Sequence, residues 1–394
     1  MLLVYGYEPS GHAAAAFSLE EAGRKAGFVV SRVEIAGDHH PAAGLAVARG
    51  YHGLLRACPG AWGGLYRSDW ARRVLRAVRG AYLGLGGAKR LRAGIRRARP
   101  DVVVCPQASV AAVLSEARRR GGLDVPVVSV LTDYGVHPFW ADPPADLLIA
   151  PSAAAAAELA SYGVPLERVR VAGLPIHPAF AALPSRAEAR STLALPAAAP
   201  VVLLSGGSKG LGGIDRTARE LLRACPRAVV MAICGANDGL RRSLSSRRES
   251  GDRLRVFGPQ PPAMIATLLA ACDLHAGKPG GLTSAESLAA GVPMVISSPL
   301  PGQEEANARH LLSAGAAAAG GSPAETARLC AEILADRDRL AALSANASRA
   351  GRPRAAEEIA AELLLFAEKV YPGRLARARA VPGESRIDYS SVDV

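Results

Sequence analysis

The chain alternates from end to end between short runs rich in β-branched residues and longer alanine-rich stretches. Each of these runs ends in a Gly, Pro, Ser or Asp turn, as buried parallel strands do. They are LLVYGY, VVVCP, PVVSVLTD, DLLIAPS, RVRVAG, PVVLLSGG, AVVMAICG, LRVFG, DLHAG and PMVISSP. Strands that alternate with helices form parallel sheets covered by helices. We therefore expect doubly wound α/β domains.

The length of the chain points to two such domains. At 394 residues it exceeds what one hydrophobic core usually supports. The strand rhythm restarts near Pro200, after the proline-rich bridge GLPIHPAFAALPS at 173–185. We expect an N-terminal domain over 1–175 and a C-terminal domain over 186–354. A last helix at 355–371 should pack back on the first domain, and 372–394 should form a loose tail.

Composition limits the classes of binding partner and the cellular compartment to be expected. An excess of 47 basic over 35 acidic residues gives a net charge of +12, which suits nucleic acid, an anionic bilayer or a phosphorylated substrate. The cysteines are scattered without metal or disulfide spacing, which favours a reducing compartment. The N-terminus reads as a strand rather than a signal peptide, and no apolar stretch reaches membrane-spanning length.

Open α/β sheets bind ligands beyond the carboxyl ends of their strands, so the turns there are the candidate sites. In SGGSKGLGG (205–213), Gly206, Gly207 and Ser208 offer N–H groups to an anion, although the order does not fit a Walker A motif. In CGAND (234–238), Asn237 could hydrogen-bond a ligand. A plain turn is the alternative at both places.

The turn KPGGLTSAES (278–287) is more informative. Gly280 and Gly281 permit close backbone approach, and the helix that begins near Thr283 directs free N–H groups at an anion. One turn further on, Glu286 could accept hydrogen bonds from two vicinal hydroxyls, as a ribose presents. The alternative is a capping box formed by Thr283 and Glu286.

The next strand end carries SSPLPGQEEANARHLL (297–312). Its turn is followed by Gln303, Glu304 and Asn307, which place polar groups at the mouth of the same cleft. A solvated helix start would explain them equally well.

Together, KPGGLTSAESLAAGVPMVISSPLPGQEEANARHLL, TDYGVHPFW and PSAAAAAELASYGVPLERVRVAGLPIHPAF resemble the monogalactosyldiacylglycerol synthase and processive diacylglycerol glycosyltransferase family. That family is close to the lipid-linked muramyl-peptide N-acetylglucosaminyltransferases, and the resemblance covers roughly residues 4 to 345. It implies a GT-B fold, in which two Rossmann-like domains face each other and the C-terminal one holds a nucleotide-sugar.

The resemblance also implies roles in donor binding. Gly280, Gly281 and Thr283 would hold the pyrophosphate, Glu286 the ribose, and Gln303 and Glu304 the donor sugar. The family reads uracil through backbone, which falls here on Gln260. Pro259 stands where an aromatic residue is usual.

In the N-terminal half, His12 follows Gly11 at a strand-to-helix turn. The family usually has G-G-G-H there, whereas YEPSGH keeps one of those glycines. His12 suits a general base, with a helix cap or phosphate contact as the alternative. By resemblance, TDYGVHPFW lies beside the acceptor, so Asp133 or His137 could assist or replace His12, near Trp140. An Asx-turn with buried aromatics is the alternative there.

Residues 49–99 interleave Trp62, Tyr66, Trp70 and Tyr82 with many Arg and Lys. Aromatic residues interleaved with basic ones predict a surface that binds one face of a membrane. It could also bind RNA, but no RNA-binding module signature accompanies it, so we expect no nucleic acid partner. Solvated helix faces around a small aromatic core are the third reading.

Two further signals are discounted. Asp336 and Asp338 form a D-x-D on a polar helix, where i and i+2 do not face each other. Asp38, His39 and His40 lack further ligands at a fitting spacing. We therefore expect no metal and no cofactor.

The sequence thus predicts a metal-independent, inverting glycosyltransferase that moves galactose or glucose from a UDP-sugar to a lipid hydroxyl, with diacylglycerol as the expected acceptor. It would be cytoplasmic and bound peripherally to the inner face of the cell membrane. The alternatives are a soluble natural-product or polyprenyl-linked acceptor, a UDP-sugar epimerase, and a non-catalytic binder of nucleotide-sugar or RNA.

Overall fold

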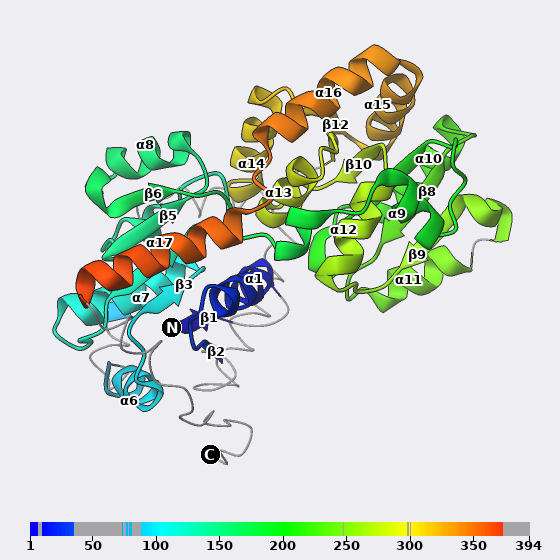
Figure 1. Cartoon of the computed structure of the whole chain (residues 1–394). Coiled ribbons are helices and arrows are strands. Elements are labelled where there is room, and N and C mark those ends of the chain that lie inside the picture. The colour runs from blue at the N-terminus through cyan, green and yellow to red at the C-terminus, as the bar shows by residue number, and fades with distance from the viewer. Residues whose placement is uncertain are drawn as a thin grey trace.

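All of the apolar runs form strands in the structure, a computed structural model that describes residues 1–6, 10–34, 73, 76–77, 79–80, 88–246, 248–297, 299 and 301–372. The described strands make two parallel sheets, one in each of two lobes (Figure 1). The fold class expected from the alternating pattern is therefore confirmed.

The N-terminal sheet has the strand order β2-β1-β3-β4-β5-β6. Its strands are β1 (Leu2–Tyr5), β2 (Ser31–Glu34), β3 (Val103–Cys105), β4 (Val127–Val130), β5 (Leu147–Ala150) and β6 (Val169–Val171). Its helices are α1 (Gly11–Lys25), α6 (Ala88–Ala98), α7 (Ala108–Arg119) and α8 (Ala153–Ser161), with 3₁₀ turns η2 (Pro138–Trp140) and η3 (Leu166–Arg168).

The C-terminal sheet has the order β12-β11-β10-β7-β8-β9. Its strands are β7 (Val201–Ser205), β8 (Val229–Ile233), β9 (Leu254–Phe257), β10 (Leu274–Gly277), β11 (Met294–Ser297) and β12 (Ala317–Gly321). Its helices are α9 (Arg186–Thr192), α10 (Ile214–Ala224), α11 (Asp238–Ser245), α12 (Pro262–Ala271), α13 (Gly281–Ala289), α14 (Gln303–Ser313), α15 (Pro323–Ala335) and α16 (Arg337–Ala350), with 3₁₀ turns η4 (Pro178–Ala182), η5 (Gly207–Lys209) and η6 (Arg248–Arg253).

Two edge strands were not expected from the sequence. β2 reads SRVE and is only partly buried, while β12 reads AAAGG and has no β-branched residue. An edge strand is paired on one side only, so its sequence need not carry the apolar run of a buried strand. These two strands pair β1 and β11 in parallel register.

Each sheet has a hydrophobic core on both faces. In the N-terminal lobe, alternate residues of β1 point to opposite sides: Val4 joins one cluster with Leu114 and Leu159, and Leu3 joins another with Leu19. The C-terminal sheet divides in the same way, with Leu203 on one face and Leu204 on the other. Strands buried on both faces account for the continuous apolar runs of the sequence.

Within the part of the chain that the structure describes, the chain crosses between the lobes twice, and the two crossings touch. The first follows β6 at Gly173, and the second lies between α16 and the last described helix, α17 (Ala355–Val370). A Cβ added to Gly173, where φ is +91°, would lie 2.9 Å from the Cβ of Ala355. Arg352 also donates a hydrogen bond of 3.2 Å to the carbonyl of Val171. Beyond the first crossing, Leu174 and Phe180 pack in the C-terminal core.

Helix α17 leaves the C-terminal lobe and lies along the N-terminal one, against α1 (Figure 1). Ile359 and Leu363 are 0% exposed and share the cluster of Leu3 and Leu19. Full burial of a side chain of this size contributes about 1.5–3 kcal/mol, so these two residues hold α17 on the first lobe.

Over the residues that the structure describes, no helix is both long and apolar enough to cross a membrane. The aromatic residues of the basic stretch at 49–99, the Asp38-His39-His40 cluster and the tail beyond residue 372 lie outside the described residues.

Candidate active site

Each lobe has one point where its strand order reverses, and the candidate site is built at these two points. In the N-terminal sheet, β1 lies between β2 and β3, and in the C-terminal sheet, β7 lies between β8 and β10. Chain segments that leave such neighbouring strands in opposite directions open a crevice at their carboxyl ends. The turns after β1, β3, β7 and β10 should therefore carry the chemistry.

His12 stands at the N-terminal reversal, in the first turn of α1. Ser10 caps this helix by accepting a hydrogen bond of 3.1 Å from the N–H of Ala13. The Nδ1 atom of His12 lies 2.9 Å from the carbonyl oxygen of Pro106, just after β3, and 3.1 Å from Oγ1 of Thr132, just after β4. The orientation of the imidazole is thus set by contacts with residues that follow β3 and β4, while His12 itself follows β1.

The hydrogen bonds determine which nitrogen of His12 is basic. A carbonyl oxygen only accepts, so in the neutral ring Nδ1 carries the hydrogen and Nε2 keeps its lone pair. Burial lowers the pKa of His12 to about 4, against the opposing effect of the Pro106 hydrogen bond. The ring is therefore neutral at pH 7, with Nε2 able to accept a proton.

Asp133, next to Thr132, reaches across to the other lobe. Its carboxylate accepts hydrogen bonds from the side-chain amides of Asn307, at 2.8 Å, and Gln303, and from the backbone N–H of Gly281. The Asn307 oxygen accepts in turn from the N–H of Tyr134 at 2.8 Å. Burial raises the pKa of Asp133 to about 7, and the amide donors only partly offset that effect.

The lobes approach one another closely at this place. A Cβ on Gly281 would lie 1.9 Å from the carbonyl oxygen of Thr132, and a Cβ on Gly135 would lie 2.4 Å from the Cβ of Ala306. Gly281 is therefore required by contact with the opposite lobe. The N-terminus of α13 holds the carboxylate of Asp133, as a helix N-terminus holds anions.

The capping box considered for Thr283 and Glu286 is wrong. Helix α13 begins two residues earlier than expected, at Gly281, with Gly280 as a cap that makes no side-chain hydrogen bond. Thr283 is thus the third helical residue, and Glu286 lies one turn further in.

Glu286 is half-buried, and its carboxyl group makes no hydrogen bond or ion pair within the described residues. Burial raises its pKa to about 8. A half-buried carboxyl group without hydrogen-bond donors could accept hydrogen bonds from the hydroxyl groups of a ligand.

The glycine-rich loop after β7 folds tightly before α10 begins. A Cβ on Gly206 would lie 2.0 Å from the carbonyl oxygen of Leu211, and Gly207 has a φ of +69°. Gly207 and Ser208 are exposed in the 3₁₀ turn η5. The helix then starts at Ile214 with Gly213 as its cap, so the loop separates the strand from the helix N-terminus.

Lys278, directly after β10, was not among the candidate residues from the sequence. Its ammonium forms an ion pair of 2.8 Å with Glu304, and the two side chains are only 9% and 12% exposed. Helix α13 and strand β11 separate Lys278 from Glu304 in the chain, so sequence spacing alone gave no sign of the pair.

A buried polar chain beneath the site was also missed. His275 on β10 lies 2.7 Å from Oγ of Ser205 through Nε2 and 2.6 Å from Oγ of Ser287 through Nδ1. Burial lowers the pKa of His275 to about 4. The neutral ring joins the end of β7 to the middle of α13, so it fixes the distance between the glycine-rich loop and the residues around Glu286.

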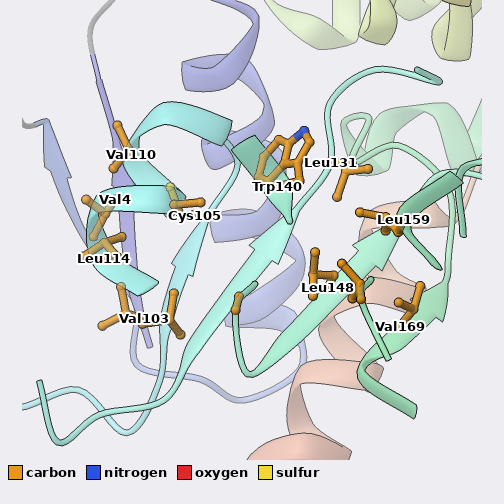
Figure 2. Close-up of a cluster of buried hydrophobic side chains, with 14 of the residues drawn as sticks. Val4, Val103, Cys105, Val110, Leu114, Leu131, Trp140, Leu148, Leu159 and Val169 are labelled. Carbon is orange, nitrogen blue, oxygen red and sulfur yellow. The ribbon is translucent and has the colours of Figure 1, made fainter. Parts of the chain in front are cut away.

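Two residues expected beside the acceptor make contacts within their own lobe. Trp140 is 5% exposed and packs in the N-terminal core with Leu131 and Leu159 (Figure 2). This packing corresponds to the alternative of buried aromatic residues. His137 caps the turn η2 by accepting from the N–H of Phe139 at 3.1 Å, and its ring packs edge-on against Phe139. This contact corresponds to the local-turn alternative rather than to a catalytic role.

Of the remaining candidates, Asn237 follows β8, Gln260 follows β9 and Gly11 begins α1. Asn237 accepts a hydrogen bond of 3.0 Å from the N–H of Leu240 and caps α11, so its oxygen is used within the turn. The side chain of Gln260 donates to the carbonyl of Pro259 at 3.0 Å. Gly11 is exposed at the start of α1 with open space around its Cα.

Metal-binding candidates find no support in the described part of the chain. Asp336 separates α15 from α16 and caps α16 by accepting from the N–H of Arg339. No group of three or more His, Cys, Asp or Glu side chains placed to hold a metal occurs among the described residues.

Comparison with known proteins agrees with the sequence resemblance. A family model described as monogalactosyldiacylglycerol (MGDG) synthase matches residues 12–176, and a model described as glycosyl transferases group 1 matches residues 209–350. The first match begins at His12 and the second includes α13 and α14.

Curated relatives match most of the chain. The chain is 30% identical over 261 residues to the processive diacylglycerol beta-glucosyltransferase of Bacillus subtilis (strain 168), covering 66% of this chain and 67% of the relative. It is 32% identical over 304 residues to a probable monogalactosyldiacylglycerol synthase 2, chloroplastic, of Oryza sativa subsp. japonica, covering 73% of this chain. The match spans 64% of that rice protein.

Solved structures share the fold at low sequence identity. The S. aureus MnaA–UDP structure has a TM-score of 0.62 at 16% identity and covers 93% of this chain and 96% of its own. Acinetobacter baumannii MurG has a TM-score of 0.58 at 17% identity and covers 91% and 97%. These likenesses establish the GT-B arrangement of the two lobes.

Proposed function

Because the chain belongs to the monogalactosyldiacylglycerol synthase and processive diacylglycerol glycosyltransferase family, we propose that it transfers a hexose from a UDP-sugar to a lipid hydroxyl. The hexose is galactose or glucose, and the acceptor is diacylglycerol. The transfer inverts the configuration at the anomeric carbon.

One observation carries this proposal: the turn after β4 of the N-terminal lobe touches the starts of α13 and α14 of the C-terminal lobe. His12 is fixed by Thr132, and the neighbouring Asp133 contacts Gly281 and Asn307 of the other lobe. A base from one lobe is thereby brought to the helix N-termini of the other, as the joining of two substrates requires.

His12 acts as the general base. Its Nε2 lone pair takes the proton of the acceptor hydroxyl while the oxygen attacks the anomeric carbon from the face opposite the UDP group. Pro106 and Thr132 hold the ring through Nδ1, so the tautomer needed for proton transfer is already present. Such a base contributes about 10²- to 10⁴-fold to the rate.

The leaving diphosphate is stabilised by the start of α13. The bond between the anomeric carbon and the phosphate oxygen breaks, and its electron pair leaves with UDP. The N–H groups of the first helical turn face this charge, and in the ligand-free protein one of them, that of Gly281, donates to the carboxylate of Asp133. Glu286 accepts hydrogen bonds from the ribose. We propose that this stabilisation needs no divalent cation.

We place the enzyme at an anionic membrane surface on the cytoplasmic side. The net charge of +12 and the basic, aromatic sequence at 49–99 support this placement. A lipid acceptor with a buried hydroxyl has to be reached at the bilayer, so the acceptor lobe should carry the contact.

The test is a lipid-product assay. The protein is incubated with UDP-glucose or UDP-galactose and with vesicles of diacylglycerol in anionic phospholipid, and the lipids are analysed by mass spectrometry. We expect hexosyldiacylglycerol and free UDP in equal amounts. Flotation of the protein with the same vesicles, compared with neutral vesicles, tests the membrane contact.

Two outcomes would overturn parts of the proposal. Release of free epimerised sugar without a lipid product would favour an epimerase. Turnover with a water-soluble acceptor, together with no flotation on anionic vesicles, would retain the transferase and reject the lipid acceptor.

A further inference from the structure

We propose that Lys278 is a positioning residue for the donor sugar, and that it acts by holding the Glu304 carboxylate at the start of α14. This inference rests on the proposed function. Lys278 occupies the first position after β10, at the strand-order reversal of the C-terminal lobe. Glu304 is the second residue of α14, whose first residue, Gln303, contacts Asp133.

The Lys278 side chain is held along its length as well as at its tip. A Cβ on Gly212 would lie 2.9 Å from its Cδ and 3.0 Å from its Cγ, so the aliphatic part of Lys278 fills the space over Gly212. The ammonium then meets Glu304 at 2.8 Å with little solvent around either group. The lysine therefore joins the glycine-rich loop after β7 to the start of α14.

Glu304 differs from the two other carboxylates of the cleft. Asp133 is met by amide donors, Glu286 has no partner, and neither forms an ion pair within the described residues. Burial without a cation raises the pKa of both, to about 7 and about 8. Glu304 instead has an ammonium in contact, which compensates its charge and fixes its orientation.

A fixed and compensated carboxylate suits recognition of sugar hydroxyls. Hydroxyl donors gain most from an acceptor that is charged and already oriented. Lys278 uses its contact with Glu304 rather than facing the start of α13, so its effect should depend on the hexose and not on the UDP portion of the donor.

The experiment compares UDP with UDP-hexose on four variants: Lys278→Met, Lys278→Arg, Glu304→Gln and the double variant. Calorimetry measures both affinities, and initial rates separate kcat from KM for the donor. Lys25→Met is the matched control, because Lys25 forms an exposed ion pair with Glu21 on α1, far from this contact.

For Lys278→Met, we expect UDP affinity within about twofold of the wild type. The UDP-hexose affinity and kcat/KM should fall about 10- to 100-fold, as expected for losing one oriented charged contact. Lys278→Arg should recover part of the loss. The double variant should be no worse than Glu304→Gln alone, because the lysine acts through the glutamate.

An equal loss of UDP and UDP-hexose affinity would show that Lys278 binds the diphosphate directly, and would overturn the inference. Additive losses in the double variant would also overturn it. Removing one charge of a buried pair can unfold a protein, but the double variant removes both and keeps the comparison with Glu304→Gln available. Wild-type protein that binds no UDP would reject the proposed function instead.

Discussion

The two strand-order reversals hold opposite kinds of groups. At the N-terminal one, His12 has its Nδ1 hydrogen-bonded by groups that follow β3 and β4. At the C-terminal one, Glu286 is half-buried and has no partner within the described residues. Under the proposed function, the group that would react is thus oriented in advance, whereas the hydrogen bonds of the group that would bind are left for the ligand to complete.

Burial acts on both groups with opposite consequences for their charge. It lowers the pKa of His12 to about 4, so the imidazole is neutral at pH 7. It raises the pKa of Glu286 to about 8, so this carboxyl carries a proton at pH 7 in the ligand-free protein. Transfer should therefore be little affected by pH near neutrality, whereas nucleotide binding should respond to it.

The largest expected effect comes from His12→Ala. We expect kcat for lipid glycosylation to fall about 10²- to 10⁴-fold, with the affinity for UDP unchanged, because the base acts on the acceptor. Initial rates and calorimetry measure the two quantities. His137→Ala is the control, since His137 caps a local turn and should leave kcat within about threefold. Full turnover by His12→Ala would assign the base elsewhere.

Glu286→Gln should weaken UDP binding by about 10- to 100-fold, because an amide presents only one acceptor oxygen to the two ribose hydroxyls. The melting temperature should not fall at pH 8, since the substitution removes a poorly solvated carboxyl. Glu332→Gln, at an exposed ion pair on α15, is the control. A variant that melted earlier but bound UDP normally would limit Glu286 to a structural role.

The affinity for UDP should rise with pH up to about pH 8 and then level off. The Glu286 pKa is raised in the free protein, and hydroxyl donors in the complex favour the ionised carboxylate, so binding releases a proton. The slope should reach at most about tenfold per pH unit for one proton. Calorimetry in buffers of different ionisation enthalpy counts the protons. The same titration on Glu286→Gln measures the pH dependence that remains without the Glu286 carboxyl group, including that of the nucleotide phosphates. Subtracting it from the wild-type curve leaves the contribution of Glu286.

The smallest expected effect is on kcat at saturating donor between pH 5.5 and 8, which should stay nearly constant. With the pKa of His12 at about 4, the base remains unprotonated across this range. Asp133 as the base would give a different profile, rising about tenfold per pH unit up to its pKa of about 7. A pH–rate profile therefore distinguishes the two assignments directly.

The ten strands with apolar runs were predictable because a strand covered on both faces needs an unbroken apolar run. Such runs can be recognised in a single sequence. β12, with the sequence AAAGG, has no such run, and its place was set by pairing with β11. Edge pairing is a tertiary property, so the sequence alone could not indicate it.

Part of the candidate site could be predicted from the sequence. The pattern of turns predicted that His12 follows β1 and Glu286 follows β10, because chain order fixes which turns share a sheet edge. The capping box failed because two glycines allowed α13 to begin before Thr283. The core packing of Trp140 and the ion pair of Lys278 could not be predicted for a common reason: a side chain's partner, whether Leu131 or Glu304, is determined by packing between distant segments.

The contact between the two crossings limits how the lobes can move. Gly173 and Ala355 meet where the chain passes between lobes, and Arg352 bonds to Val171 beside them. Two connections at one place act as a single pivot, so the lobes can swing open about it but cannot slide past each other. Cutting the chain near Gly173 would leave both lobes attached, because α17 remains anchored on α1 by buried contacts.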